Sequence, residues 1–395
     1  MGVIPNLNLR LLWLTARYAP GRGGMAVSCD RAVHALRRRG AWIDLVHLSR
    51  AATGASFVPR ENGSERVLPA GEEAPHELAA LWPQLAEAGG GWTHVVAFGG
   101  ALPATAASVY AAWLGLPLVV LLRGNDFDTG VYLPERRAAL EDALRRAARV
   151  GCVTEDLRRR VQRLYPNTAA VWTPNGIDTA DWRALPSDRA RAAAFRAQQV
   201  QPGRKVIGLF GDLKAKKGVD LLLEAIATSG LAEALHLVIV GVLPSTELPR
   251  AVPGLAMTSV PPLPRTDLIP HLLACDAVAL PSLYEGFPNL LLEAAALGVP
   301  LLASAAGGAG VLRDGVHGAV FRSGDADDCR RALERVAAAD AATLAGWRRA
   351  CKRLAAQFTL ERECERYLDL FAETAAPAAA QVAHLPAIGG RKGGA

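Results

Sequence analysis

The sequence predicts an α/β protein of two domains, each a parallel sheet with helices on both faces. Three observations support this. The 395 residues are enough for two domains with a core each. Short apolar segments alternate with amphipathic helical patterns through both halves of the chain, which is typical of such sheets. The composition, 51% hydrophobic and 21% charged, is that of a globular protein.

The first half begins with an apolar strand, expected over 11–15, and a glycine turn that contains Gly23 and Gly24. Further strands are expected at 42–48, 93–98, 116–122 and 150–154, and helices at 25–39, 103–114, 135–148 and 155–164. The stretch after 48 is polar and contains glycine, so we expect a loop region there. We assign this half, residues 1–185, to the first domain.

The second alternation of strands and helices follows a polar helix expected over 188–199. Strands are expected at 205–210, 235–240, 257–260, 277–280 and 301–304, and helices at 219–229, 326–340, 341–357 and 360–374. We assign 200–358 to the second domain and 359–375 to a separate last helix. Residues 376–395 are rich in Ala, Pro and Gly, which predicts a disordered tail.

The net charge and the distribution of basic residues bear on which partners the protein could bind. The formal net charge is +6, and the basic residues gather in helical runs at 31–39, 136–149 and 158–163. Such runs are typical of solvated helix faces. An anionic membrane surface or an anionic acceptor is the alternative partner for the basic first domain. Nucleic acid is disfavoured because no recognised binding motif accompanies the charge.

Cysteine usage and the apolar runs bear on location. The six cysteines and eight histidines show no metal-ligand spacing, and no CxxC occurs. This pattern predicts structural thiols in a reducing compartment. We find no signal-peptide pattern and no apolar run of membrane-spanning length. We therefore expect a cytoplasmic protein, with peripheral contact at the inner face of a membrane left open.

The most informative segment runs from 281 to 300 and reads PSLYEGFPNLLLEAAALGVP. It follows a buried strand, and Pro288 suits the first position of a helix. The turn therefore places free backbone N–H groups at a helix N-terminus, which is an anion site suited to a diphosphate. Two carboxylates, Glu285 and Glu293, stand across the turn with seven residues between them.

This segment resembles the signature of the retaining glycosyltransferases of family four, which have the two-domain GT-B fold. In that family the first Glu, here Glu285, lies beside the donor sugar, and the second, here Glu293, binds the nucleotide ribose. The resemblance implies that the turn lines the donor site through Gly286, Phe287, Pro288, Asn289 and Leu290. It also implies two Rossmann-like domains that face a central cleft, and a last helix that crosses back to the first domain.

A second donor segment, Gly211–Gly218, follows the first strand of the second domain. The family has Gly-Arg-Leu and then Lys-Gly here, and its Arg and Lys hold the donor diphosphate. Lys217 matches that Lys, whereas Asp212 reverses the charge of the Arg. Lys214 is expected to supply the missing cation, as a point charge rather than a bidentate guanidinium. A solvated lysine loop is the alternative.

Three glycine turns extend the resemblance. Gly23 and Gly24 are similar to the family's glycine loop at the cleft, where glycine lets the backbone approach a phosphate. Gly307–Gly308 occupies the place of a Gly-Gly turn that abuts the donor. The segment Trp172–Asp178 looks like the Pro-Asn-Gly-Val-Asp turn with which the family leaves its first domain.

The loop Arg123-Gly124-Asn125-Asp126 takes the place of the family's His-Gly-x-Asp, which faces the reacting sugar. Arg123 is not a general base, and we expect it to clamp an acceptor phosphate or the leaving group. Asp126 is expected to orient an acceptor hydroxyl, and an Asp-rich loop that caps itself is the alternative. Asp126-Phe127-Asp128 also forms an Asp-x-Asp, the Mn²⁺ motif of the GT-A fold, but the GT-B resemblance implies no metal.

Together these residues imply a retaining transferase that uses an α-linked nucleotide-sugar, UDP- or GDP-linked, without cofactor or metal. Its acceptor is a saccharide, a lipid-linked molecule or a small molecule. Glu285, Asp126 and Arg123 are the candidates for catalysis. Two alternatives stay open. One is a GT-B epimerase or inverting transferase, and the other is a nucleotide-sugar-binding protein without turnover.

Overall fold

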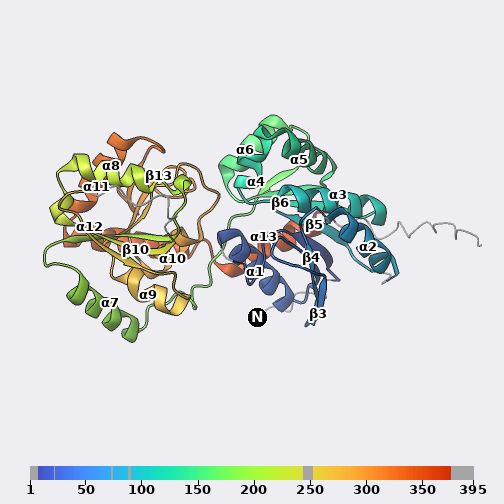
Figure 1. Ribbon diagram of the computed structural model, residues 1–395, viewed down its shortest axis with the longest axis horizontal. Coiled ribbons are helices and arrows are strands. Elements are labelled where there is room, and N and C mark those ends of the chain that lie inside the picture. Colours follow the sequence, from blue (N-terminus) through green and yellow to red (C-terminus); the bar gives the residue numbers. More distant parts are fainter. Residues whose placement is uncertain (1–7, 22, 73, 88–89, 243–251, 375–395) are drawn as a thin grey trace, which may run out of the picture.

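The computed structural model describes residues 8–21, 23–72, 74–87, 90–242 and 252–374. Two sheets lie side by side along the longest axis of the molecule, and each has helices on both faces (Figure 1). The first sheet uses the N-terminal half of the chain and the second uses the C-terminal half. The structure is therefore the expected pair of α/β domains.

The first sheet has eight strands in the order β3-β4-β2-β1-β5-β6-β7-β8, and its neighbours are parallel except for the β3–β4 hairpin. Its central strands are continuous apolar runs, so the sheet is buried on both faces. The elements are β1 (Arg10–Thr15), α1 (Gly24–Arg38), β2 (Trp42–Ser49), β3 (Ser56–Arg60), β4 (Gly63–Pro69), α2 (Ala74–Glu87), β5 (His94–Phe98), α3 (Ala101–Leu114), β6 (Leu118–Leu122), α4 (Asn125–Asp128), α5 (Pro134–Arg146), β7 (Arg149–Cys152), α6 (Glu155–Leu164) and β8 (Ala170–Trp172).

The second sheet has six parallel strands in the order β11-β10-β9-β12-β13-β14. The strand order reverses beside β9 and β12, where open α/β sheets bind ligands. The elements are α7 (Pro186–Gln199), β9 (Lys205–Asp212), α8 (Val219–Ser229), β10 (Leu235–Val242), β11 (Ala256–Val260), α9 (Arg265–Leu273), β12 (Ala277–Leu280), α10 (Asn289–Leu297), β13 (Leu301–Ser304), β14 (Gly318–Phe321), α11 (Ala326–Ala338), α12 (Ala341–Ala355) and α13 (Leu360–Ala372).

The prediction of a loop region after residue 48 is wrong, because that stretch contains the β3–β4 hairpin and α2. All five residues of β3 are exposed, so the strand has no apolar run that would reveal it. The turn consists of Glu61 and Asn62, with a positive φ of 57° at Asn62, and β4 begins at Gly63 with a φ of 137°. The edge strands β8 and β14 were also not predicted, and they have only three and four residues.

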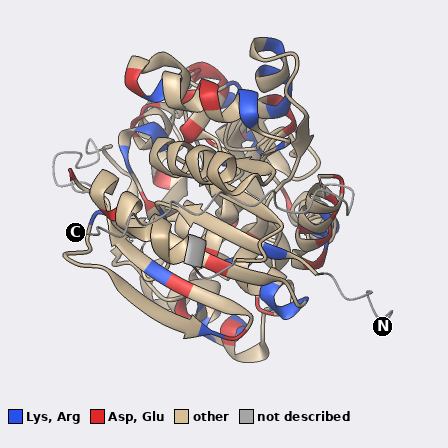
Figure 2. Cartoon of the chain, turned by 90° about the vertical axis from the view of Figure 1, so that its right-hand side faces the viewer, with Lys and Arg blue, Asp and Glu red and all other residues tan. Residues whose placement is uncertain are grey.

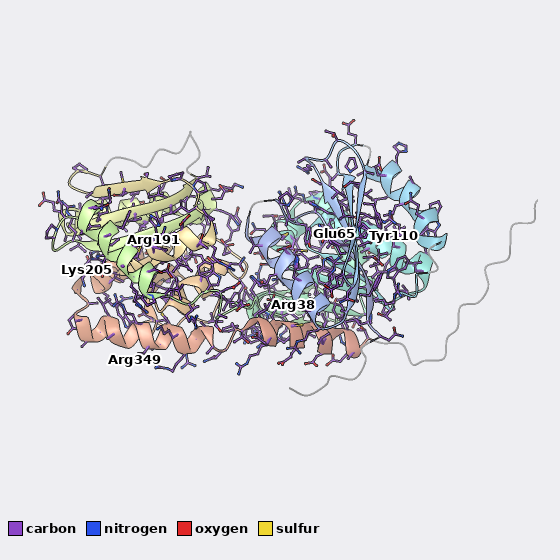
Figure 3. All side chains as sticks on the ribbon, turned by 90° about the horizontal axis from the view of Figure 1, so that it is seen from below. Arg38, Glu65, Tyr110, Arg191, Lys205 and Arg349 are labelled. Carbon is purple, nitrogen blue, oxygen red and sulfur yellow. The ribbon has the colours of Figure 1, made fainter. Side chains whose placement is uncertain are left out.

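The last helix, α13, packs on the first domain after α12 has packed on the second. Tyr367 and Phe371 belong to the same buried cluster as β1 and α1. Figure 3 shows α12 and α13 following one another beneath both domains. The chain crosses between the domains twice, first around Ile177 and again around Phe358. The two crossings lie side by side, since the Ile177 N–H donates to the Phe358 carbonyl at 2.8 Å and the Leu360 N–H donates to the Ile177 carbonyl at 3.0 Å.

Charges of both signs are interspersed over the helices of the first domain (Figure 2). Within α5, Arg137 pairs with Glu141 at 2.8 Å and Arg146 pairs with Asp142 at 2.7 Å. Pairing of this kind reduces the field that a basic run projects into solution. No helix among the described residues combines the length and apolar character needed to span a bilayer.

Candidate active site

The Glu-x7-Glu segment lies at the carboxyl edge of the second sheet, between β12 and α10. Pro288 is the residue before the helix rather than its first residue, so α10 begins at Asn289. The first N–H groups of any helix lack intrahelical acceptors. The start of α10 lies against the first domain, because the Asn289 side chain donates to the Gly24 carbonyl at 3.1 Å.

Glu285 and Lys217 form an ion pair of 2.6 Å beside this helix terminus. The Glu285 side chain is 14% exposed, and the Lys216 ammonium lies 3.9 Å from its other oxygen. Gly218, with φ of 68°, brings the lysine turn directly against the Pro281 carbonyl, where a side chain would not fit. Two cations and a carboxylate thus stand at one end of α10.

Lys216, which we did not predict, lies beside Glu285, whereas Lys214 pairs with Asp212. Lys214 is 65% exposed and pairs with Asp212 at 2.8 Å, so its charge is offset within its own loop. Lys216 is more enclosed, and burial lowers the pKa of its ammonium. Gly211 lies at the end of β9 with φ of 106°, against Gly241 of β10. The adjacent lysines 216 and 217 were the available signal.

Glu293 lies on α10 one turn beyond Asn289. Burial raises the pKa of its carboxyl to about 7, while Arg31 and Arg265 oppose that shift. A carboxylate with such a pKa is poised to accept hydrogen bonds when a ligand supplies them.

The donor turn meets the first domain at close range. A Cβ atom on Gly124 would lie 2.6 Å from the Cα atom of Gly286, so both backbones need glycine there. Gly23 has a φ of 110° and precedes α1, and a Cβ atom on Gly24 would lie 3.7 Å from Nδ2 of Asn289 in the donor turn. The predicted glycine loop and the predicted donor turn are therefore brought together.

The remaining predicted turn residues divide between the core and the cleft. Phe287 is buried, and its ring lies 5.3 Å from that of Phe358 at the second chain crossing. Leu290 is partly buried at the start of α10. The Gly307 N–H donates to the Ser304 hydroxyl at 2.9 Å, which ties the Gly-Gly turn to the end of β13.

Arg123 does not face the cleft as we expected. It is 7% exposed, and its guanidinium donates to the Tyr367 hydroxyl at 3.0 Å and to the Asn175 side chain. It also lies over the Phe98 ring at 4.9 Å. The guanidinium is therefore held by the last helix and by Asn175, and its role toward an acceptor phosphate or the leaving group stays a prediction.

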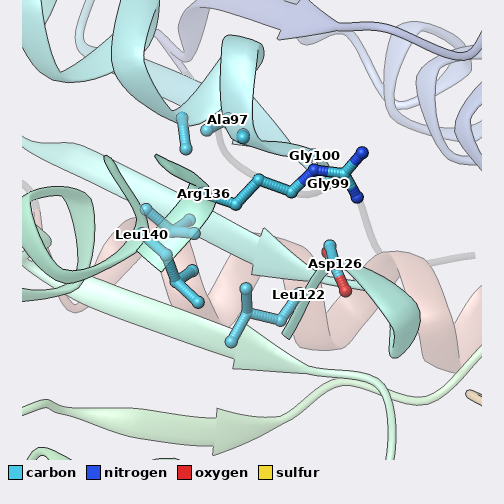
Figure 4. Close-up of a pocket in the computed structure, with 10 residues that line it drawn as sticks. Ala97, Gly99, Gly100, Leu122, Asp126, Arg136 and Leu140 are labelled. Carbon is cyan, nitrogen blue, oxygen red and sulfur yellow. The ribbon is translucent and has the colours of Figure 1, made fainter. Parts of the chain in front are cut away.

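Asp126 caps its own turn, which matches the alternative left open by the sequence. Its carboxylate accepts the Arg123 N–H at 2.8 Å and the Phe127 N–H at 3.1 Å. Burial nevertheless raises the pKa of Asp126 to about 6. The carboxylate also borders a small recess, which Arg136 of α5 lines together with Gly99 and Gly100 (Figure 4).

The two carboxylates of the Asp-x-Asp sequence point to different partners. Asp128 pairs with Arg160 of α6 at 2.5 Å, whereas Asp126 turns to its own backbone. Asp128 and Arg160 of the first domain line a cavity of about 620 Å³, and Tyr284 and Glu285 of the second domain line it too. The cavity therefore lies between the domains, next to the Glu285–Lys217 pair.

Two family models match the chain. The model of Glycosyltransferase Family 4 matches residues 22–181, and that of Glycosyl transferases group 1 matches residues 204–339. The D-inositol 3-phosphate glycosyltransferase of Mycolicibacterium gilvum is 35% identical over 42% of this chain and 39% of its own length. That of Geodermatophilus obscurus is 33% identical over 55% and 52%. The chain thus spans about half the length of these relatives, or less.

Solved structures share the fold. Sucrose-phosphate synthase from Thermosynechococcus elongatus has a TM-score of 0.77 at 17% identity, covering 92% of this chain and 98% of its own. Anabaena HepE in complex with UDP-glucose has a TM-score of 0.71 at 17% identity, covering 92% and 99%. One family model covers the first domain and the other covers the second. The chain therefore belongs to the group 1 glycosyltransferases of family four, which have the GT-B fold.

Proposed function

We propose that this protein is a retaining glycosyltransferase that takes its sugar from an α-linked UDP-sugar. One observation carries the proposal. The Glu285–Lys217 pair, the N-terminus of α10 and Glu293 converge at the carboxyl edge of the second sheet. A helix N-terminus and two lysines suit a diphosphate, and a carboxylate one turn along suits a ribose diol.

The donor occupies this site in parts. Its diphosphate lies at the start of α10, where Lys217 exchanges its bond to Glu285 for a phosphate oxygen. Its ribose reaches Glu293, and its sugar enters the interdomain cavity beside Glu285. Anabaena HepE, which shares the fold, was solved with UDP-glucose, and this favours a uridine donor over a guanosine donor.

The chemistry follows from the charges at the site. As the bond from the sugar to the diphosphate breaks, positive charge develops on the sugar and negative charge on the leaving group. Glu285 stabilises the first charge, while Lys217 and the α10 terminus stabilise the second. The acceptor hydroxyl attacks from the leaving-group side and passes its proton to the departing diphosphate, so configuration is retained without a protein nucleophile. Divalent metal is not required, because the lysines and the helix neutralise the diphosphate.

For the acceptor we propose a small phosphorylated polyol. The relatives in this comparison are named D-inositol 3-phosphate glycosyltransferases. The recess beside Asp126 holds Arg136, which has no ion pair among the described residues. Its guanidinium suits a phosphate, and Asp126 suits a hydroxyl.

Transfer from UDP-glucose and UDP-N-acetylglucosamine to inositol phosphate tests the proposal, with NMR of the product. An α-linked product whose yield is unchanged by EDTA supports it. A β-linked product indicates an inverting transferase. Binding of UDP without any transfer or donor hydrolysis indicates a binding protein. Loss of transfer in EDTA rules out the metal-free mechanism.

A further inference from the structure

Six side chains from both domains, the chain crossing and the last helix form a closed ring at the base of the cleft. In order around the ring they are Glu363, Arg31, Asn289, Asn175, Arg123 and Tyr367, which returns to Glu363. Of these, Asn289 alone comes from the sheet-bearing part of the second domain. We call this set the interdomain ring.

Glu363 is almost fully buried within the ring, with 1% of its side chain exposed. One carboxylate oxygen accepts the Arg31 Nε–H at 3.0 Å and the Gly176 N–H at 2.9 Å. The other accepts Arg31 Nη2 at 3.4 Å and the Tyr367 hydroxyl at 3.5 Å. A buried carboxylate needs partners of this kind. Glu363 therefore fixes Arg31 against the chain crossing.

Arg31, held in this way by Glu363, also contacts the donor turn at Asn289. Its Nη1 donates to Asn289 Oδ1 at 3.2 Å, and Asn175 Nδ2 donates to the same oxygen at 3.2 Å. Asn175 also donates to the Phe287 carbonyl at 2.7 Å. The first residue of α10 and the backbone before it are thus held from the first domain and the chain crossing.

We propose that Glu363 is a positioning residue of the donor site. Through Arg31 it holds Asn289 and so aims the first N–H groups of α10 at the diphosphate. The diphosphate site is then complete only while the two domains are held together by the ring. Glu363 itself does not touch the nucleotide. The inference rests on the proposed function, in which UDP binds at this turn.

Calorimetric titration of UDP and of uridine into the full-length protein tests the role of Glu363. Glu363→Gln keeps the shape but removes the charge that fixes Arg31. We expect UDP affinity to fall about tenfold, the effect of losing about 1.4 kcal/mol, with uridine affinity unchanged. Glu361→Gln, at an exposed position on the same helix, should leave both affinities unchanged. An equal loss for both ligands, or no loss for UDP, would overturn the proposal.

A double-mutant cycle tests the route through Asn289. If Glu363 acts through Asn289, the variant with Glu363→Gln and Asn289→Ala should bind UDP no more weakly than Asn289→Ala alone. Multiplying losses would contradict that route. Should Glu363→Gln fail to fold, Arg31→Lys keeps the charge but loses the fork, and the same selective loss for UDP is expected. Wild-type protein that does not bind UDP would instead refute the proposed function.

Discussion

Two turns face each other across the cleft, and they use their polar residues in opposite ways. Each follows a buried strand and leads into a helix, the first after β6 and the second after β12. The second-domain turn leaves Glu285 and Lys217 at the edge of a cavity. In the first-domain turn, the Arg123 side chain points into the interior and donates to Tyr367, and the Asp126 carboxylate accepts a backbone N–H of the turn itself. The second-domain turn thus presents its charged groups to a cavity, whereas the first-domain turn holds its charged groups within the fold.

A role for Asp126 in transfer would be the strongest argument against this difference between the two turns. If Asp126 also orients the acceptor, Asp126→Asn should lower kcat about a hundredfold while donor affinity stays the same. Steady-state kinetics with a donor titration measures both quantities. A folded variant that melts earlier but turns over normally would leave Asp126 as a cap alone.

The lysines of the donor turn give the next largest effect. Lys217→Ala should weaken UDP binding by about 1.5–3 kcal/mol, because a charge-assisted hydrogen bond to phosphate is lost. Lys216→Ala should act in the same direction. Calorimetry with UDP and uridine separates phosphate contacts from base contacts. Comparable losses for both ligands would show that these lysines do not bind the diphosphate.

Glu293 predicts a pH dependence. Its pKa is raised to about 7 by burial, so its carboxylate form, which accepts the ribose hydroxyls, dominates only above that pH. UDP affinity should fall about tenfold from pH 8 to pH 6, and Glu293→Gln should remove this dependence. The free energy of unfolding depends on pH in the opposite direction to UDP affinity. Folding favours the neutral acid, so this group's contribution to the free energy of unfolding should decrease as pH rises from about 4.5 to about 7.

Lys214 should give the smallest effect. Its exposed pair with Asp212 is worth less than about 1 kcal/mol, and neither residue faces the donor turn closely enough to pair with Glu285. Lys214→Ala should therefore change UDP affinity less than twofold, on the order of 0.4 kcal/mol. A loss as large as that of Lys217→Ala would restore Lys214 as the second cation and displace Lys216.

The difference between the two turns also shows which parts of the site could be predicted from the sequence. The donor turn lies within 281–300, so strand, helix start and both carboxylates form a local pattern. The surroundings of Arg123 depend on Tyr367, which is 244 residues away. Nothing in the local pattern reveals that contact. The β3–β4 hairpin was missed for a different reason, since its exposed edge strand carries no apolar periodicity.

Hydrogen–deuterium exchange with and without UDP tests the central claim most directly, because it locates the ligand on the chain. We expect UDP to slow amide exchange at 215–218 and at 286–293, where backbone N–H groups and lysines meet the diphosphate. Slower exchange at 173–178 should accompany it, through the interdomain ring. Protection confined to the first domain, or no protection at 286–293 in protein saturated with UDP, would contradict a nucleotide site at the start of α10.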